Sequence, residues 1–232
     1  MKSIKMGNLP GTVVITIDGP AGAGKSTVAK ALAQRLSYSY LDTGAMYRAL
    51  TLKALQKKID LENESALIRL AQETKIDLVD DPRAGLTVML DGRNVSEQIR
   101  SQEVTNNTFY IARVPGVREV MVGWQREIGA RRNIVVEGRD VGTVVFPQAT
   151  KKFYLDANPE ERALRRIKEL RGRGKKVDDQ ELKRDLQERD QKDFTRSVGA
   201  LKKADDAVLI DSTRLSINQV VDEMMRHIQS DG

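Results

Sequence analysis

The stretch TVVITIDGPAGAGKS, from Thr12 to Ser26, decides the fold class of this 232-residue chain. Its first half, Thr12 to Ile17, is a β-branched, apolar run bounded by glycines, which predicts a buried parallel strand. A glycine-rich turn follows directly. Beyond Lys25, apolar residues recur at intervals of three and four, which predicts a helix with one buried face; they are Val28, Ala29, Leu32, Ala33 and Leu36. A strand, a loop and a helix are therefore expected in immediate succession.

The turn from Gly19 to Ser26 has the pattern G-x-x-x-x-G-K-[ST]. Glycines let successive backbone N–H groups point inward, and the helix adds the positive end of its dipole, so a triphosphate fits there. Lys25 would lie against the β and γ phosphates, and the Ser26 hydroxyl would be a ligand of Mg²⁺. The residues expected to bind the nucleotide are Gly19, Pro20, Ala21, Gly22, Ala23, Gly24, Lys25, Ser26 and Thr27. A chance glycine turn is the alternative, which the strand and helix around the loop disfavour.

This loop alone does not separate a kinase from a GTPase or a motor ATPase. The sequence contains no N-K-x-D segment of the kind that reads guanine, which disfavours a GTPase. A motor ATPase would need an apolar strand that ends in a pair of acidic residues, and no obvious one is present, which disfavours that class as well.

Further strand-like runs alternate with helical segments, at Asn133–Glu137, Lys152–Leu155 and Val208–Ile210. Parallel neighbours need crossover connections, so we expect an α/β fold with a mainly parallel sheet and helices on both faces, in one domain spanning 1–232. Two helix starts stand out, at Asn158-Pro159 and at Ser216, where Gln219 completes a capping-box pattern.

Two stretches do not fit this alternation. Leu86–Leu90, Asp91-Gly92 and Arg93–Val95 predict an antiparallel hairpin, which we interpret as an insertion at about residues 70–105. The basic stretch RGRGKK, Arg171–Lys176, lies between two charged helices. It is either a hinged flap, in a segment of about residues 162–190, or a plain solvated loop.

Composition limits the possible chemistry. The net charge of +6 and the pI near 9.5 suit a polyanionic partner, although composition alone favours a lysine-rich solvated surface. The absence of cysteine excludes disulfides, thiolate metal sites and cysteine nucleophiles. The N-terminal apolar run is too short for a signal peptide or a membrane span, so a cytoplasmic protein is expected. The single histidine, His227, is interpreted as a surface side chain, and no His, Asp and Glu cluster suggests a second metal.

Three further segments supply arginines and acids beyond the loop. LDTGAMYR (Leu41–Arg48) follows the first helix, EGRDVGTVVFP (Glu137–Pro147) follows a strand, and ERDQKDFTR (Glu188–Arg196) ends the helix after the basic stretch. Ligands in parallel sheets bind beyond the carboxyl ends of the strands, so Arg48, Arg139 and Asp140 are expected near the phosphates.

With these blocks in this order, the chain resembles the bacterial-type cytidylate kinases from about Val14 to its final helix. The resemblance also includes the P-loop block IDGPAGAGKST and the segment LKKADDAVLIDST. It implies a nucleoside monophosphate kinase with a CORE, an acceptor-binding insertion and an arginine-bearing LID. The implied activity, in pyrimidine nucleotide metabolism, transfers the γ-phosphoryl group of ATP to CMP or dCMP, giving ADP and CDP or dCDP.

The resemblance also implies roles for individual residues. Arg48, Arg139 and Arg196 would hold the acceptor phosphate, because a guanidinium group can make two hydrogen bonds to phosphate oxygens. Arg189 and Asp193 would hold the ribose of the acceptor. Thr43 is expected to contact CMP as well. Arg118 and Asp140 match the base-reading positions, and the Asp140 carboxylate would accept from the exocyclic amine of cytosine. Phe109 stands where relatives commonly have a base-reading serine, and the adjacent Thr108 could substitute for it.

In phosphoryl transfer, alignment and fixed positive charge matter more than covalent chemistry. We therefore expect Lys25, Mg²⁺ on Ser26, and the LID residues Arg165 and Arg166 to surround the γ phosphoryl. The second pKa of the acceptor phosphate is about 6, so no general base is needed. Asp42 either holds Mg²⁺ waters from a second shell or caps the next helix.

Two rival functions remain at this stage. One is a P-loop kinase with a small non-nucleotide acceptor, such as a hydroxy acid or a sugar. The other is a basic RNA-binding protein that senses ATP, although only 4% of the residues are aromatic and no stacking pattern is visible. We expect a monomer that binds small nucleotides and neither nucleic acid nor membrane.

Overall fold

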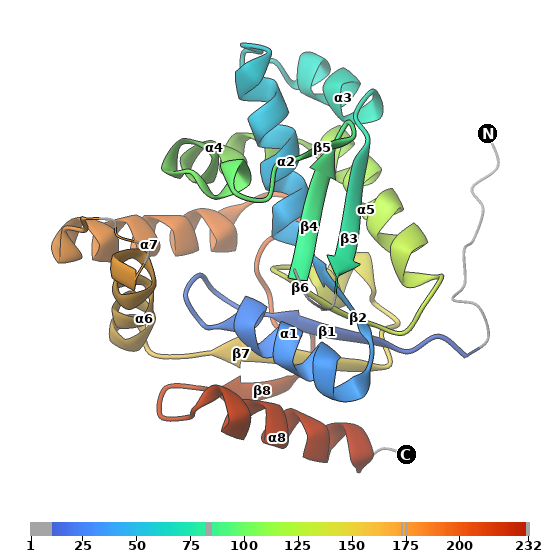
Figure 1. The fold of residues 1–232 in the computed structure, drawn as a ribbon, viewed down its shortest axis with the longest axis vertical. Coiled ribbons are helices and arrows are strands. Elements are labelled where there is room, and N and C mark those ends of the chain that lie inside the picture. The colour runs from blue at the N-terminus through green and yellow to red at the C-terminus, as the bar shows by residue number, and fades with distance from the viewer. Residues whose placement is uncertain (1–10, 82–84, 173, 175, 231–232) are drawn as a thin grey trace. The chain divides into compact units, whose positions relative to one another are not determined.

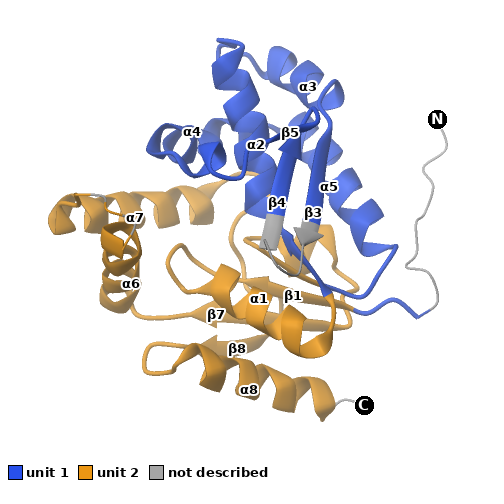
Figure 2. Cartoon of the chain, viewed as in Figure 1, with its two compact units in different colours: residues 1–13, 39–134 blue, residues 14–38, 135–232 orange. Residues whose placement is uncertain are grey.

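The computed structural model describes residues 11–81, 85–172, 174 and 176–230 of the chain (Figure 1). The first ten residues, in which no leader is expected, and Arg173 and Lys175 of the basic stretch lie outside the described residues. The chain forms two compact units, coloured separately in Figure 2. Unit 1 contains residues 1–13 and 39–134, and unit 2 contains residues 14–38 and 135–232. The domain boundaries given above stay predictions.

Unit 2 contains parallel strands with helices packed beside them. Its strands are β1 (Val14–Asp18), β6 (Ile134–Gly138, which begins at the last residue of unit 1), β7 (Lys151–Asp156) and β8 (Val208–Asp211). They lie in the order β6-β1-β7-β8. Its helices are α1 (Lys25–Leu36), α6 (Pro159–Gly172), α7 (Asp179–Thr195) and α8 (Ile217–Gln229), with a π-helical turn, η2, at Val141–Val145. The expected α/β fold with a parallel sheet flanked by helices is confirmed.

The register places the strand ends that matter for function. β1 pairs in parallel with β7, with Asp18 opposite Tyr154, and β7 pairs in parallel with β8, with Asp156 opposite Asp211. Every residue of β1 and of β6 is buried, as continuous apolar runs in a parallel sheet should be. The loops that follow β1, β7 and β8 therefore leave the same edge of the sheet.

Unit 1 is built from helices and a small antiparallel sheet. Its helices are α2 (Thr43–Gln56), α3 (Glu64–Gln72), α4 (Gln102–Ala112) and α5 (Pro115–Gly129), with a 3-10 turn, η1, at Gln98–Arg100. Its strands are β2 (Ser39–Asp42), β3 (Ile76–Asp81), β4 (Gly85–Leu90) and β5 (Arg93–Asn94). Ala45, Ala49, Val88, Leu90 and Ile99 form a buried cluster that joins α2 to β4 and η1.

The expected hairpin is present as β4 and β5. Its turn uses Asp91 and Gly92, whose φ angles of 48° and 81° are left-handed, as a type I′ turn requires. β4 also pairs along its whole length with β3, so the element is a three-stranded sheet rather than a hairpin alone.

Both predicted helix starts are also confirmed. Asn158 accepts a hydrogen bond from the N–H of Glu161, and Ser216 and Gln219 form a reciprocal capping box. None of the described helices combines the length and the apolar composition that a membrane crossing requires.

Candidate active site

The loop between β1 and α1 is shaped by its glycines. At Gly19 a Cβ atom would lie 2.0 Å from the carbonyl oxygen of Leu155 in β7, so only glycine fits. Gly24 is the N-cap of α1 and has a left-handed φ of 91°. The N–H groups of Gly22, Ala23 and Gly24 make no hydrogen bond to any of the described residues. The loop thus offers backbone donors at a helix N-terminus, where an anion binds favourably.

Lys25 is buried within a cluster of charged residues in unit 2. Its Nζ donates to the carbonyl oxygen of Pro20 at 2.7 Å, and the residue is 5% exposed. Burial lowers its pKa to about 7, with Arg139 and Arg189 acting in the same direction and Glu137 and Asp193 opposing them. The structure therefore brings three of the predicted acceptor-binding residues, Arg139, Arg189 and Asp193, within electrostatic reach of the loop lysine.

Arg139 and Asp193 form a half-buried ion pair, with Nε and Oδ2 2.7 Å apart. Burial alone would lower the pKa of Arg139, but the carboxylate of Asp193 raises it. Burial alone would raise the pKa of Asp193, but Arg139, Arg189 and Arg196 hold it below the usual value. Arg196 lies 4.0 Å from Asp193 and donates to the carbonyl oxygen of Gly199. Asp193 thus pairs with two of the three arginines predicted to bind the phosphate, Arg139 and Arg196.

Asp18 is a buried residue of this region that the sequence analysis missed. Its two carboxylate oxygens accept from the N–H groups of Val141 and Gly142, at 2.9 and 2.7 Å. Burial raises the pKa of Asp18 to about 6, against the effect of these two hydrogen bonds, and the buried Asp140 adds to the increase. Asp18 therefore fixes the turn that directly follows Arg139 and Asp140. Its place at the end of an apolar strand, just before Gly19, is the only sequence signal of this role.

Of the two predicted LID arginines, the structure brings one to the loop. Arg165 donates to the carbonyl oxygen of Ala23 at 3.4 Å, and to the hydroxyl and carbonyl oxygens of Ser212 at 2.9 and 2.6 Å. Arg166 instead pairs with Glu169 on the same helix, at 2.7 Å. Ser212, which follows β8, was not identified from the sequence.

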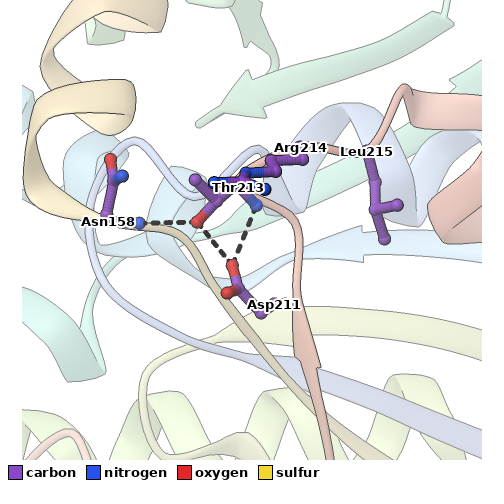
Figure 3. Close-up of a pocket in the computed structure, with 5 residues that line it drawn as sticks. All are labelled: Asn158, Asp211, Thr213, Arg214 and Leu215. Atoms are coloured by element: carbon purple, nitrogen blue, oxygen red, sulfur yellow. Dashed lines mark hydrogen bonds between the residues drawn. The ribbon is translucent and has the colours of Figure 1, made fainter.

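A pocket of about 430 Å³ lies beside Ser212 (Figure 3). It is lined by Asn158, Asp211, Thr213, Arg214 and Leu215. Figure 3 shows the Thr213 hydroxyl between Asp211 and Asn158: it donates to the carboxylate of Asp211 and accepts from the backbone N–H of Asn158 at 3.0 Å. Ser212, between the lining residues Asp211 and Thr213, donates to the carbonyl oxygen of Ala23 at 3.4 Å, so the segment that lines the pocket contacts the phosphate-binding loop.

Unit 1 carries the other predicted acceptor-binding residues. Arg48 donates to Oδ2 of Asp42 at 2.8 Å, while Oδ1 of Asp42 accepts from the N–H of Ala45 at 2.8 Å. Asp42 is therefore the N-cap of α2, which was one of its two expected roles. Burial would raise its pKa, but Arg48 and the Ala45 hydrogen bond hold it below the usual value. Thr43 is buried at the first position of α2.

The predicted base-reading residues of unit 1 lie on α4 and α5. Arg118 is buried, with its guanidinium carbon 5.7 Å from the centre of the Tyr47 ring and Nη1 3.4 Å from the carbonyl oxygen of Ala112. Thr108 lies within 3.5 Å of the Thr51 hydroxyl on α2. Phe109, the next residue, stacks edge to face with Tyr110 at 6.0 Å between ring centres.

Comparison with known proteins agrees with this geometry. The model of the cytidylate kinase family matches residues 15–230. A cytidylate kinase of Anoxybacillus flavithermus is 52% identical over 217 residues, which cover 94% of this chain and 96% of that protein. A cytidylate kinase of Desulforamulus reducens is 50% identical over 215 residues, covering 93% and 96%. The chain belongs to the cytidylate kinase family.

Membership of the cytidylate kinase family is shown over nearly the whole chain, since the matched residues include the phosphate-binding loop, both helices α6 and α7, and α8. The matched residues also include every residue to which the sequence analysis assigned a role in the site. The individual roles of those residues stay predictions.

Proposed function

We propose that this member of the cytidylate kinase family is an ATP-dependent phosphotransferase that converts CMP or dCMP to CDP or dCDP, with release of ADP. The observation that carries the proposal is the cluster around Lys25. There a phosphate-binding loop of the expected sequence lies within electrostatic reach of Arg139, Arg189 and Asp193. A site that joins two phosphorylated substrates needs this combination of a donor loop and fixed cations.

For the donor, the loop residues supply both backbone and side-chain contacts. The N–H groups of Gly22, Ala23 and Gly24 would bind phosphate oxygens, and Lys25 would turn from the Pro20 carbonyl to the β and γ phosphates. Ser26 is exposed at the start of α1, and its hydroxyl is an oxygen ligand of the kind Mg²⁺ prefers. Mg²⁺ bound there with ATP would neutralise phosphate charge during transfer.

The pocket in Figure 3 suits the nucleoside part of ATP. Its lining includes Thr213 and Asp211, whose hydroxyl and carboxylate are hydrogen-bonded to each other, and Ser212 between them contacts the loop. A polar pocket next to a phosphate-binding loop is where the sugar and base of a bound nucleotide would lie.

For the acceptor, we propose that Arg48, Arg139 and Arg196 bind the phosphate of CMP and that Arg189 and Asp193 bind its ribose. In this structure Arg48 forms an ion pair with Asp42, and Arg139 forms one with Asp193. The phosphate of CMP would either displace these carboxylates or share the guanidinium groups with them. Thr43, Arg118 and Asp140 would contact the nucleoside. The Asp140 carboxylate accepts hydrogen bonds only, so it favours the amine of cytosine over the carbonyl oxygen of uracil.

During transfer, the chain's own residues would align the reactants and supply positive charge. Lys25 and Arg165 would surround the moving phosphoryl group, with Arg166 as the further candidate. Asp42, beside its observed role as the N-cap of α2, is proposed to accept hydrogen bonds from waters bound to Mg²⁺. The acceptor phosphate has a second pKa of about 6, so it attacks without a protein base. We also propose that the enzyme is a cytoplasmic monomer that acts on free nucleotides rather than nucleic acid.

The test is an assay of ADP release from MgATP with CMP, dCMP, UMP, AMP and small hydroxy acids or sugars as acceptors. We expect turnover with CMP and dCMP to exceed that with the others. Arg48→Ala and Asp140→Ala should each reduce kcat/KM for CMP about 10- to 100-fold, the loss typical of a charged hydrogen bond, while circular dichroism shows an intact fold. Faster turnover of a hydroxy acid, or unchanged activity in both variants, would refute the proposal.

A further inference from the structure

Unit 2 contains a buried ion pair between two helices that has no role in the site as proposed above. Arg162 lies on α6 and Asp190 on α7, and each is 8% exposed. Nη1 of Arg162 donates to Oδ2 of Asp190, and its Nε donates to the carbonyl oxygen of Ala157 at 3.1 Å. The pair thus joins the two helices that flank the basic stretch.

Both members of this pair also bind the same residue of the phosphate-binding loop. Oδ1 of Asp190 accepts from the N–H of Ala21 at 3.1 Å, and Nη1 of Arg162 donates to the carbonyl oxygen of Ala21 at 2.9 Å. Both backbone polar groups of Ala21 are therefore held by a single ion pair. The Ala21 methyl packs with Ala163 and Leu186 of the same two helices, so its position is fixed on its apolar side as well.

Fixing Ala21 orients the donors that follow it in the chain. The next three residues, Gly22 to Gly24, carry the N–H groups that would bind phosphate, and glycines do not restrict their own backbone. Gly22 is also confined by α6, because a Cβ there would lie 3.0 Å from the carbonyl oxygen of Arg162. The contact with Arg162 and Asp190 thus supplies the rigidity that the glycine-rich sequence lacks.

The same pair sits next to the side chains proposed to act on the substrates. Arg162 precedes Arg165 by one turn of α6, and Asp190 follows Arg189 and precedes Asp193 by one turn of α7. A shift of either helix relative to the loop would therefore move the arginine of α6 or the acceptor-binding residues of α7 relative to the donor phosphates.

Stability alone does not account for such a pair. Desolvation of two buried charges offsets most of their attraction, and well-packed apolar residues of similar volume often stabilise a fold equally well. Apolar side chains, however, could not hold the N–H and carbonyl groups of Ala21. We propose that Arg162 and Asp190 are positioning residues, which fix the phosphate-binding loop against α6 and α7 in the geometry that binds MgATP and transfers its phosphoryl group. This inference rests on the proposed function.

The first test replaces the whole pair with apolar residues, as Arg162→Met with Asp190→Leu. We expect a chain that still folds, with a lower melting temperature because the N–H and carbonyl groups of Ala21 lose their partners, an MgATP Kd at least about 10-fold higher by calorimetry, and kcat lower by about 100-fold, as for a misplaced catalytic group. Arg35→Met with Asp222→Leu is the matched control, because that pair joins α1 to α8 on the surface of the same unit. Affinity and kcat within about twofold of the parent chain in a folded double variant would overturn the inference.

A second comparison decides the matter even if the double variant does not fold. Asp190→Asn keeps an oxygen that can accept from the N–H of Ala21, whereas Asp190→Ala does not. We expect Asp190→Asn to retain most of the MgATP affinity that Asp190→Ala loses. Equal losses in both variants would overturn the inference. Calorimetry with MgATP alone needs no acceptor, so a parent chain that binds MgATP but does not phosphorylate CMP would refute the proposed function and leave this test valid.

Discussion

The ammonium group of Lys25 lies among buried charges rather than in water. Its pKa is therefore lowered to about 7 before any nucleotide is bound. Its Nζ donates to a neutral carbonyl, that of Pro20, while Arg139 and Arg189 disfavour a further positive charge nearby. A triphosphate would reverse this balance, because it brings several negative charges to the loop. The lysine is therefore expected to gain a proton as ATP binds.

We predict that MgATP binding at about pH 8 takes up close to one proton per chain, since a group with a pKa near 7 is mostly neutral there and becomes charged against the phosphates. Calorimetry in two buffers with different ionisation enthalpies measures this uptake. Lys25→Arg is the control, because arginine stays charged at this pH and should remove the uptake. A buffer-independent enthalpy in the parent chain would contradict the low pKa of Lys25.

At the level of single residues, the sequence analysis assigned roles to the loop, to several arginines and to Asp42 and Asp193, but not to Asp18, Arg162 or Asp190. Lys25 and Ser26 belong to a pattern with a known geometry. Asp18 and Asp190 lie within blocks that carry the family resemblance, but neither they nor Arg162 has a role in a pattern of known geometry, and in a chain with 31% charged residues they resemble ordinary surface charges. Their partners are far along the chain, as with Asp18 and Val141, which are 123 residues apart. Only the fold makes such pairs visible.

Helix α2 begins at a carboxylate that has two partners. Asp42 accepts from the N–H of Ala45, one of the donors that a helix start leaves without an internal partner, and it holds Arg48 one turn further on. Because both partners favour the ionised form, the carboxylate stabilises the fold only when it is charged.

We predict that Asp42→Ala lowers the free energy of unfolding by about 1–2 kcal/mol at neutral pH. The folded-state pKa lies below the ordinary value of 3.8, so this contribution is present above that value and is lost as the pH falls through the lower folded pKa. Urea denaturation from about pH 5 to about pH 2 should show the gap between parent and variant closing. A gap of constant size would mean that the charge of Asp42 contributes nothing.

At the level of elements, the sequence predicted those with strong local signals. The turn at Asp91 and Gly92 was recognisable because both residues tolerate a left-handed backbone. Strand β3 was not recognised as a separate strand, because its sequence IDLVDD contains acids that disfavour a strand. Its pairing with β4 compensates for this, and that pairing is not encoded locally.

In the molecule as a whole, the proposed donor site belongs to unit 2, which is assembled from two separate stretches of chain. The loop comes from residues 14–38, while Arg139, Arg162, Arg165 and Asp190 come from residues 135–232. The contacts of Ala21 and Ala23 with these residues therefore exist only in the folded state. A ligand of the loop should bind the folded chain and not the unfolded one.

We predict that MgATP at about 100 times its Kd raises the free energy of unfolding by about 2.7 kcal/mol, because it binds only the folded state. For a chain of this size the melting temperature should rise by about 2–4 °C per kcal/mol. Differential scanning calorimetry measures the rise, and Lys25→Ala should reduce it. An unchanged melting temperature in the parent chain would mean that the loop does not bind MgATP.

The ion pair between Arg139 and Asp193 has a consequence for affinity. A long arginine side chain that is loose in the empty enzyme must lose its rotational freedom when a ligand arrives, at a cost of about 0.5–1.5 kcal/mol. Here the carboxylate 2.7 Å away restrains that side chain beforehand. The conformational entropy of this side chain is therefore lost during folding. A nucleotide that contacts Arg139 binds more tightly, because its binding free energy does not have to offset this loss.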